Sequence, residues 1–176
     1  MDRLWAPWRM AYILGGDETS DRCIFCHFPS LGSAHHEEHQ ILWADERAFV
    51  MMNKYPYNNG HVMVIPRAHV ADPSLLTDED HRALHELLRR STAILREAMG
   101  AHGMNLGMNL GRVAGAGIDQ HCHWHIVPRW NGDTNFMPVV GDVKVLSEHV
   151  AGTYARLAPH FAKLGPLPAA PHDASE

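Results

Sequence analysis

Three short runs of apolar residues, each bounded by polar or turn-forming residues, mark the first part of the chain. The runs at 41–44 (ILWA) and 48–52 (AFVMM) are separated by the polar triplet 45–47, and a third run follows at 61–65. Short runs rich in β-branched and aromatic residues between polar turns are typical of strands. The pattern therefore predicts a strand pair followed by a third strand.

Apolar residues take up helical spacing farther along, between Thr77 and Met99. Thr77 precedes Asp80 by three residues, which resembles a capping box, and Gly100 supplies an end to the helix. The pattern predicts one long amphipathic helix. Its expected core stripe consists of Leu84, Leu87, Leu88, Ile94 and Leu95.

The other segments divide the chain into one domain with extensions. Residues 1–22 contain large apolar side chains and are expected to pack as an N-terminal arm, whereas 23–142 form the domain itself. Residues 143–164 are predicted to form a C-terminal helical extension, and 165–176, with their prolines, a disordered tail. Residues 29–39 lack apolar periodicity, which predicts a surface loop. The predicted fold class is α+β, with an antiparallel sheet of about five strands and the long helix on one face.

Composition narrows the possible functions only moderately. The chain has 176 residues, 45% of them hydrophobic, which is enough for one packed domain. A formal net charge of −5 argues against a nucleic-acid partner, because a nucleic-acid groove needs a concentrated basic face. No apolar run suits a membrane span or an export leader, and three cysteines suit a reducing compartment. We therefore expect a cytoplasmic protein without a membrane partner.

Three histidines at alternate positions, His121, His123 and His125, are the strongest chemical signal in the chain. In a strand, side chains at every second position share one face, about 6.6 Å apart. The three imidazoles are then expected on one surface with Trp124 on the other, and Pro128 is expected to end the strand.

Three interpretations of this triplet compete. The chain contains 15 histidines, so the first is incidental clustering. The second is a zinc ion shared by the three imidazoles. The third is covalent catalysis, because a neutral imidazole is a good nucleophile toward phosphorus near neutral pH.

A glycine-rich segment at 109–117 stands directly before the triplet, and residues 104–107 predict a strand that leads into it. Small residues let backbone N–H groups approach anionic oxygens closely, so this loop favours the catalytic interpretation as a phosphate cradle. Taken by itself the loop is equally consistent with a flexible turn.

Cys23 and Cys26 form a Cys-x-x-Cys pair. In a reducing compartment such a pair indicates half a zinc site or a redox motif, although the βαβ setting of a thioredoxin-like motif is absent. Two buried thiols without a metal are the simplest alternative. If zinc is bound, two more ligands are needed, and His69 and His121 are the candidates. The resulting Cys2His2 site would be closed and structural.

The motifs together resemble those of the histidine triad (HIT) nucleotide hydrolases and transferases. The resemblance includes the triplet followed by Pro128 and Arg129, the upstream Asn53, and the segment 60–70 (GHVMVIPRAHV). The segments 2–10 and 128–136 resemble the branch of that family that contains bacterial diadenosine tetraphosphate phosphorylases. Taken in order, the resemblance covers residues from about 1 to about 155.

The resemblance implies a HIT-like fold for residues 23–142 and a homodimer, often built through the helix and an edge strand. Zinc-bearing members, and the related galactose-1-phosphate uridylyltransferases, use a cysteine pair, a histidine and the first triad histidine. Here that set corresponds to Cys23, Cys26, His69 and His121. The implied cofactor is structural zinc, with no organic cofactor.

The resemblance also implies roles at the reaction centre. His123 corresponds to the nucleophile, which attacks the α-phosphorus of an adenine nucleotide and forms an adenylyl-histidine. His125 and the backbone N–H groups near Gly115 and Gly117 then oppose charge on the phosphate oxygens. Many family members have a hydroxyl residue late in this loop, whereas the chain reads Gly-Ala-Gly-Ile at 115–118. The hydroxyl group that would contact a phosphate oxygen there is therefore missing.

Residues that contact the nucleotide are implied in the same way. Asn109 corresponds to a residue near the phosphates, and Asn53 and His61 to residues near the ribose. Ile24 and Phe25 correspond to residues that line the adenine slot. Ordinary core packing is the alternative for all these residues, and it explains Ile24 equally well.

The acceptor of the adenylyl group decides the reaction. If inorganic phosphate is the co-substrate, the product is ADP and the enzyme is a diadenosine tetraphosphate phosphorylase. The segment 128–133 favours this reaction. Water yields AMP and makes a dinucleoside polyphosphate hydrolase or an adenosine phosphoramidase. A non-catalytic, zinc-stabilised nucleotide-binding module is a further alternative.

Overall fold

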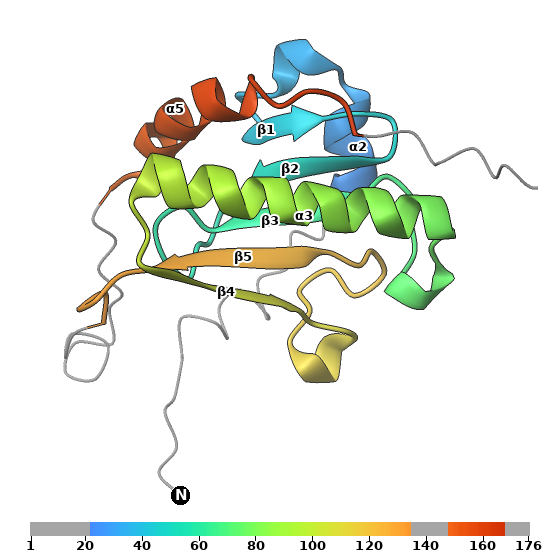
Figure 1. Ribbon diagram of the computed structural model, residues 1–176. Helices are drawn as coiled ribbons and strands as arrows, with labels where there is room; N and C mark the ends of the chain where they lie inside the picture. Colours follow the sequence, from blue (N-terminus) through green and yellow to red (C-terminus); the bar gives the residue numbers. More distant parts are fainter. Residues whose placement is uncertain (1–21, 135–147, 168–176) are drawn as a thin grey trace, which may run out of the picture.

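A computed structural model describes residues 22–134 and 148–167. These residues form one antiparallel sheet of five strands in the order β1-β2-β3-β5-β4 (Figure 1). The α+β class, the five strands and the long helix are therefore confirmed. The strands are β1 (Ile41–Ala44), β2 (Ala48–Met52), β3 (Val62–Pro66), β4 (Gly103–Met108) and β5 (Trp124–Arg129). The helices are α2 (Ile24–Ser30), α3 (Asp78–Met99) and α5 (Val150–Phe161), with 3₁₀ turns η1 (Ser33–His35), η2 (Pro73–Leu75) and η3 (Arg112–Ala114).

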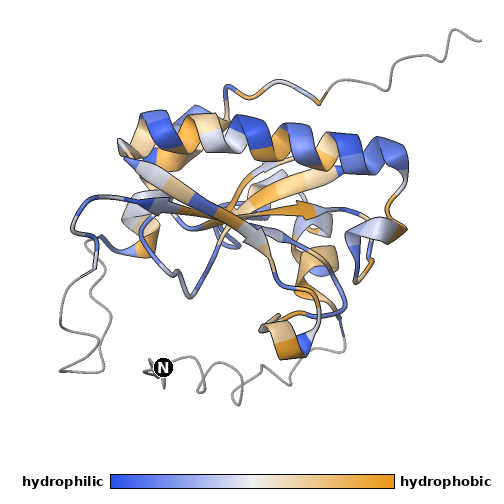
Figure 2. Ribbon diagram, turned by 60° about the horizontal axis from the view of Figure 1, so that its bottom comes forward, coloured by the Kyte–Doolittle hydropathy of each residue, from blue (hydrophilic) through white to orange (hydrophobic). Residues whose placement is uncertain are grey.

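Helix α3 begins and ends where its sequence predicts. The Thr77 hydroxyl accepts a hydrogen bond from the Asp80 N–H (3.1 Å), which satisfies one of the first free backbone donors. Gly100 ends the helix in the left-handed conformation with φ +57°. The helix lies across the sheet, with its hydrophilic residues turned outward in Figure 2. Its buried residues are Ala83, Leu84, Leu87, Leu88, Ser91 and Leu95.

The sheet separates two apolar clusters because side chains alternate between its faces. On β3, Val62 and Val64 pack in a cluster with α3 and α5, whereas Met63 and Ile65 pack in a second cluster with Phe25 of α2. Met63 is the register partner of His125 on β5. The histidine therefore shares the face of the sheet that α2 covers, and α3 supports this sheet from behind.

Several segments differ from the sequence-based expectation. Pro128 lies inside β5, where it pairs with Met104 of β4, and the strand continues to Arg129. The expected loop 29–39 includes the end of α2 and the turn η1. Residues 1–21, 135–147 and 168–176 lie outside the described part of the chain, so the arm and the start of the C-terminal extension stay predictions.

The predicted disordered tail begins at residue 165, but the packed domain extends beyond this residue. Leu167 is buried in the cluster beneath α3. The Arg90 side chain also donates to the carbonyls of Gly165 (3.3 Å) and Pro166 (3.2 Å). Residues 165–167 therefore belong to the packed domain.

We expect that Asp133→Ala destabilises the fold by about 2 kcal/mol, because several hydrogen bonds to a charged group are lost together. The Asp133 carboxylate, which is 8% exposed, accepts from Arg129 (2.6 and 2.9 Å), Asn58 (2.8 Å) and the Trp130 N–H (3.1 Å). It thereby fixes the turn after β5. Urea unfolding of both proteins at neutral pH measures the difference.

The stabilisation that Asp133 provides is expected to depend on pH. Hydrogen bonds from Arg129 lower the pKa of Asp133 from 3.8 to about 2. The carboxylate therefore stabilises the fold fully above pH 3.8, and this contribution is lost as the pH falls through about 2. The exposed pair of Asp119 and Arg112 supplies the control, and Asp119→Ala should change stability little. Equal effects of the two substitutions would contradict the prediction.

Candidate active site and metal centre

Only one histidine of the triplet lies on the regular strand. His125 is in β5, whereas His121 and His123 lie in the segment before it, because pairing with β3 and β4 begins only at Trp124. The Cys122 N–H anchors this segment by donating to the Val70 carbonyl (2.7 Å). The expectation that a strand carries all three residues is therefore wrong. The ring centroids of His123 and His125 are nevertheless only 4.9 Å apart, so the structure brings them together.

His123 is buried and held with one ring nitrogen engaged. Its Nδ1 lies 2.9 Å from the His121 carbonyl, which can only accept, so Nδ1 carries the proton and Nε2 the lone pair. The Phe25 ring packs edge-on against it with centroids 5.0 Å apart. Burial lowers the pKa of His123 below its ordinary 6.5 despite the hydrogen bond, so the neutral ring is favoured. A neutral imidazole with Nε2 unprotonated is the form that a nucleophile requires.

A second chain of hydrogen bonds fixes the proton of His125. The Tyr57 N–H donates to Nδ1 of His61 (3.0 Å), so neutral His61 has its proton on Nε2. That Nε2 lies 2.9 Å from Nδ1 of His125 and donates to it. Neutral His125 therefore has its proton on Nε2. The two catalytic candidates thus differ in function, because His123 presents a lone pair on Nε2 and His125 presents a donor.

The structure brings Cys23, Cys26, His69 and His121 together, with one potential ligand atom from each lying within 4.8 Å of the others. The Nδ1 of His121 lies 3.5 Å from Sγ of Cys23 and 3.6 Å from Sγ of Cys26, and the Nδ1 of His69 lies 3.2 Å from Sγ of Cys26. This cluster can hold a metal ion.

The chemistry of the donors fits a metal. His121 Nε2 lies 2.9 Å from the Pro66 carbonyl, which can only accept, so its Nδ1 lone pair is directed at the two sulfurs. Burial lowers the pKa of His121 to about 4, which keeps this nitrogen unprotonated at neutral pH. Among the described residues, the three triad histidines form no such group, so their interpretation as a shared zinc site finds no support.

Two residues predicted to contact the nucleotide lie at the ends of strands β2 and β4. Asn53 follows β2, accepts from the Tyr55 N–H (2.8 Å) and directs its amide to Sδ of Met63 (3.6 Å), the register partner of His125. The side chain of Asn109 donates to the Gly115 carbonyl (3.4 Å), which ties the end of β4 to the glycine loop. The contacts of Asn53 and Asn109 with a nucleotide stay predictions.

The glycine loop is partly engaged with itself. The Gly115 N–H donates to the Arg112 carbonyl (2.9 Å), so this N–H meets a phosphate only if that bond breaks. Gly117 is exposed.

In α2, Phe25 is buried in the apolar cluster, whereas Ile24 is exposed, which excludes core packing for Ile24. The role of these residues with a nucleotide stays a prediction.

Tyr57 is a site residue that the sequence did not indicate. Its N–H sets the tautomer of His61, and its ring stacks on the His61 ring with centroids 4.8 Å apart and an interplanar angle of 19°. Residue type does not indicate this role, because a backbone donor can come from any residue type.

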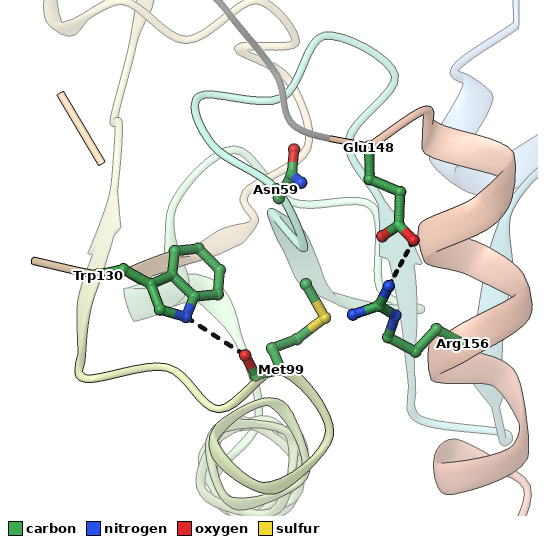
Figure 3. A pocket seen from close by; sticks show the side chains of 5 residues that line it. All are labelled: Asn59, Met99, Trp130, Glu148 and Arg156. Carbon is green, nitrogen blue, oxygen red and sulfur yellow. Dashed lines mark hydrogen bonds and ion pairs between the residues drawn. The ribbon is translucent and has the colours of Figure 1, made fainter. Parts of the chain in front are cut away.

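A cavity of about 380 Å³ lies elsewhere, where the ends of α3 and α5 meet the turn after β5 (Figure 3). Figure 3 shows Trp130 donating to the Met99 carbonyl and Arg156 paired with Glu148. The first interaction joins the turn after β5 to the end of α3, and the second joins α5 to the segment directly before it. The five lining residues, Asn59, Met99, Trp130, Glu148 and Arg156, include none of the predicted site residues.

A family model described as HIT domain matches residues 35–132, more than half of the chain. The chain belongs to the histidine triad (HIT) family. A relative from Mycobacterium tuberculosis named AP-4-A phosphorylase is 32% identical over 167 residues, which cover 93% of this chain and 86% of the relative.

Solved structures of HIT proteins agree with the fold. A Zn-bound histidine triad family protein from Mycobacterium smegmatis has a TM-score of 0.63 at 25% identity, over 80% of this chain and 94% of its own. A hypothetical histidine triad nucleotide-binding protein from Sulfolobus tokodaii has a TM-score of 0.62 at 27% identity, over 79% and 89%. Within the described part of this HIT protein, no helix is both long and apolar enough to cross a membrane.

Proposed function

We propose that this HIT protein cleaves diadenosine tetraphosphate by phosphorolysis, through an adenylyl group carried on His123. The observation that carries the proposal is the bond between His123 Nδ1 and the His121 carbonyl, which leaves the Nε2 lone pair for attack. The AP-4-A phosphorylase relative, which aligns over 93% of the chain, supports the choice of substrate.

The reaction proceeds in two displacements. Nε2 of His123 forms a bond to the α-phosphorus, the bond from that phosphorus to the bridging oxygen breaks, and ATP leaves. An oxygen of inorganic phosphate then attacks the same phosphorus, the phosphorus–nitrogen bond breaks, and ADP leaves. His125 Nε2–H donates to a non-bridging oxygen in both transition states, where one well-placed donor is commonly worth a few kcal/mol.

The test separates the phosphorylase from its alternatives. Pure protein is incubated with diadenosine tetraphosphate, with and without inorganic phosphate, and the nucleotides are resolved by chromatography. ADP plus ATP formed only with phosphate supports the proposal. AMP plus ATP under both conditions identifies a hydrolase, whereas no turnover directs the assay to adenosine phosphoramidates and then to a binding function.

We also propose that the cluster of Cys23, Cys26, His69 and His121 holds a structural zinc ion. Two thiolates and two imidazole nitrogens form the usual tetrahedral set of a closed site. Two ligands flank the first turn of α2, one follows β3, and one adjoins the nucleophile. Bound zinc therefore links α2 to the segment that carries His123 and stabilises the position of that segment. The Zn-bound Mycobacterium smegmatis relative supports the choice of metal.

A homodimer is proposed from the edge of the sheet. Strand β4 is outermost in the order, and Leu106 on it is 44% exposed. Leu106 lines a groove of about 350 Å³ together with apolar, polar and charged residues of α3: His85, Leu88, Arg89, Thr92, Ala93 and Arg96. An exposed strand edge with an exposed leucine suits pairing of two copies about a two-fold axis.

Leu106→Lys is expected to convert the dimer into a monomer, because it places a charge at the centre of the proposed interface. Light scattering coupled to size-exclusion chromatography measures the mass. Leu110→Lys is the matched control, since Leu110 is 42% exposed but lies after the strand. A monomeric unsubstituted protein, or a dimer that persists in Leu106→Lys, would contradict the proposed interface.

A further inference from the structure

His35, Glu38 and His39 form a second cluster of potential metal ligands, which shares no residue with the cysteine cluster. His35 is the last residue of η1, and Glu38 and His39 belong to the turn that connects η1 to β1. The His39 N–H donates to the His35 carbonyl (3.1 Å), an i to i+4 bond that makes one α-helical turn. Residues four apart in such a turn lie on the same side, and the residue at i+3 lies beside them.

The three side chains already converge. Nδ1 of His35 lies 3.2 Å from a carboxylate oxygen of Glu38, and one potential ligand atom from each residue lies within 4.8 Å of the other two. His35 and Glu38 are exposed and His39 is half-buried, so the donors are accessible from solvent. Bonds of 2.0–2.2 Å from nitrogen and oxygen to one ion need only a small further approach.

Packing holds this turn in place. The His39 ring stacks on the Phe28 ring of α2, with centroids 4.0 Å apart and an interplanar angle of 10°. At the other end, the Ile41 N–H donates to the His36 carbonyl (2.8 Å), which joins the turn to β1. A ligand set held by packing loses less conformational entropy on binding than one on a mobile loop.

We propose that His35, Glu38 and His39 form a surface site for a divalent transition-metal ion of the zinc, nickel or copper class. Imidazole nitrogens suit these ions, whereas magnesium and calcium prefer oxygen ligands throughout. Neutral imidazoles with one carboxylate give the site a charge of −1, which attracts a dication. Three protein ligands leave the remaining coordination positions to water, so the ion exchanges with solvent. The site is independent of the catalytic proposal and of the cysteine cluster.

The experiment counts the ions with nickel as the probe. Protein without an affinity tag, and with its zinc content measured, is titrated with Ni²⁺ near neutral pH by calorimetry. One saturable nickel per chain is expected in addition to any zinc. His35→Gln and Glu38→Gln should each weaken its affinity at least about tenfold, the loss usual even for outer-shell partners of a metal site. Circular dichroism checks that both variants fold.

The chain offers a matched control pair in His81 and His85, two exposed histidines four residues apart on α3. They belong to no three-ligand group among the described residues, and Nδ1 of His85 is bonded to the His81 carbonyl (2.9 Å). Replacing both by Gln should leave the nickel affinity unchanged. No binding by the unsubstituted protein, equal affinity in His35→Gln, or loss in the control overturns the proposal.

Cobalt gives a second readout that identifies the donors. Co²⁺ bound at His35, Glu38 and His39 should produce no thiolate-to-cobalt charge-transfer absorption, because the site contains no sulfur. Absorption of that kind in the zinc-loaded protein would place the added ion at Cys23 and Cys26, which also overturns the proposal.

Discussion

Replacement of His123 by Asn is expected to lower the turnover of diadenosine tetraphosphate by about 10⁴-fold or more, the scale of loss when a covalent nucleophile is removed. The amide of Asn cannot form the phosphorus–nitrogen bond. The Nδ1 bond to the His121 carbonyl orients the imidazole but cannot supply a substitute nucleophile. Product formation under saturating substrate and phosphate measures the loss.

Two controls make this result specific to the nucleophile. Zinc content and nucleotide affinity should be unchanged in His123→Asn, because the variant keeps the cysteine cluster and the sheet. Cys122→Ala changes the buried neighbour of His123 and should keep most of the activity. Turnover within tenfold of the unsubstituted protein in His123→Asn would show that His123 is not the nucleophile.

Cys26→Ser is expected to lose the zinc and to unfold at a temperature about 8–16 °C lower. A ligand present at a thousand times its dissociation constant stabilises the folded state by about 4 kcal/mol. For a domain of this size, 1 kcal/mol corresponds to about 2–4 °C. The loss is expected because Cys26 approaches both His69 and His121, so one substitution breaks the contacts of two ligands. Metal analysis and calorimetric melting measure the two effects.

A chelator distinguishes loss of zinc from loss of packing. Chelation of the unsubstituted protein should reproduce the lower melting temperature of Cys26→Ser and should not lower that of the variant further. Cys122→Ala, which alters a cysteine outside the cluster, should keep its zinc. A fully metal-loaded Cys26→Ser protein, or an unsubstituted protein purified with less than half a zinc per chain, would reject the structural site.

Local signals predicted the framework well. The start of α3 follows from the side-chain oxygen of Thr77, and its end follows from the left-handed backbone of Gly100. Both effects are local, so the sequence shows where they occur. The first three strands follow from short apolar runs with polar turns between them. Helix α2 was not predicted, because seven residues with Pro29 near the end give too short a pattern to show a helical period.

The composition of the site could be predicted better than its geometry. The alternating histidines and the Cys-x-x-Cys pair are local motifs, and four residues named from the sequence meet in one cluster. The extent of β5 depends on where its pairing with β3 and β4 starts, at Val64 and at Met108, so His121 and His123 fall outside it. The proton positions on the histidine rings depend on the backbone carbonyl of His121 and the backbone N–H of Tyr57. Every residue type except proline has both groups, so the sequence does not reveal these contacts.

The alternation along β5 limits how this gene can change in length. His125 lies on the α2 side of the sheet, and Ile126 is fully buried on the α3 side. Deleting or inserting one residue beside His125 would exchange the two faces, placing an imidazole under α3 and an isoleucine beside His123. Libraries that vary loop length in this protein should therefore leave 121–127 intact, and variants with a single-residue length change there should be absent from any population selected for activity.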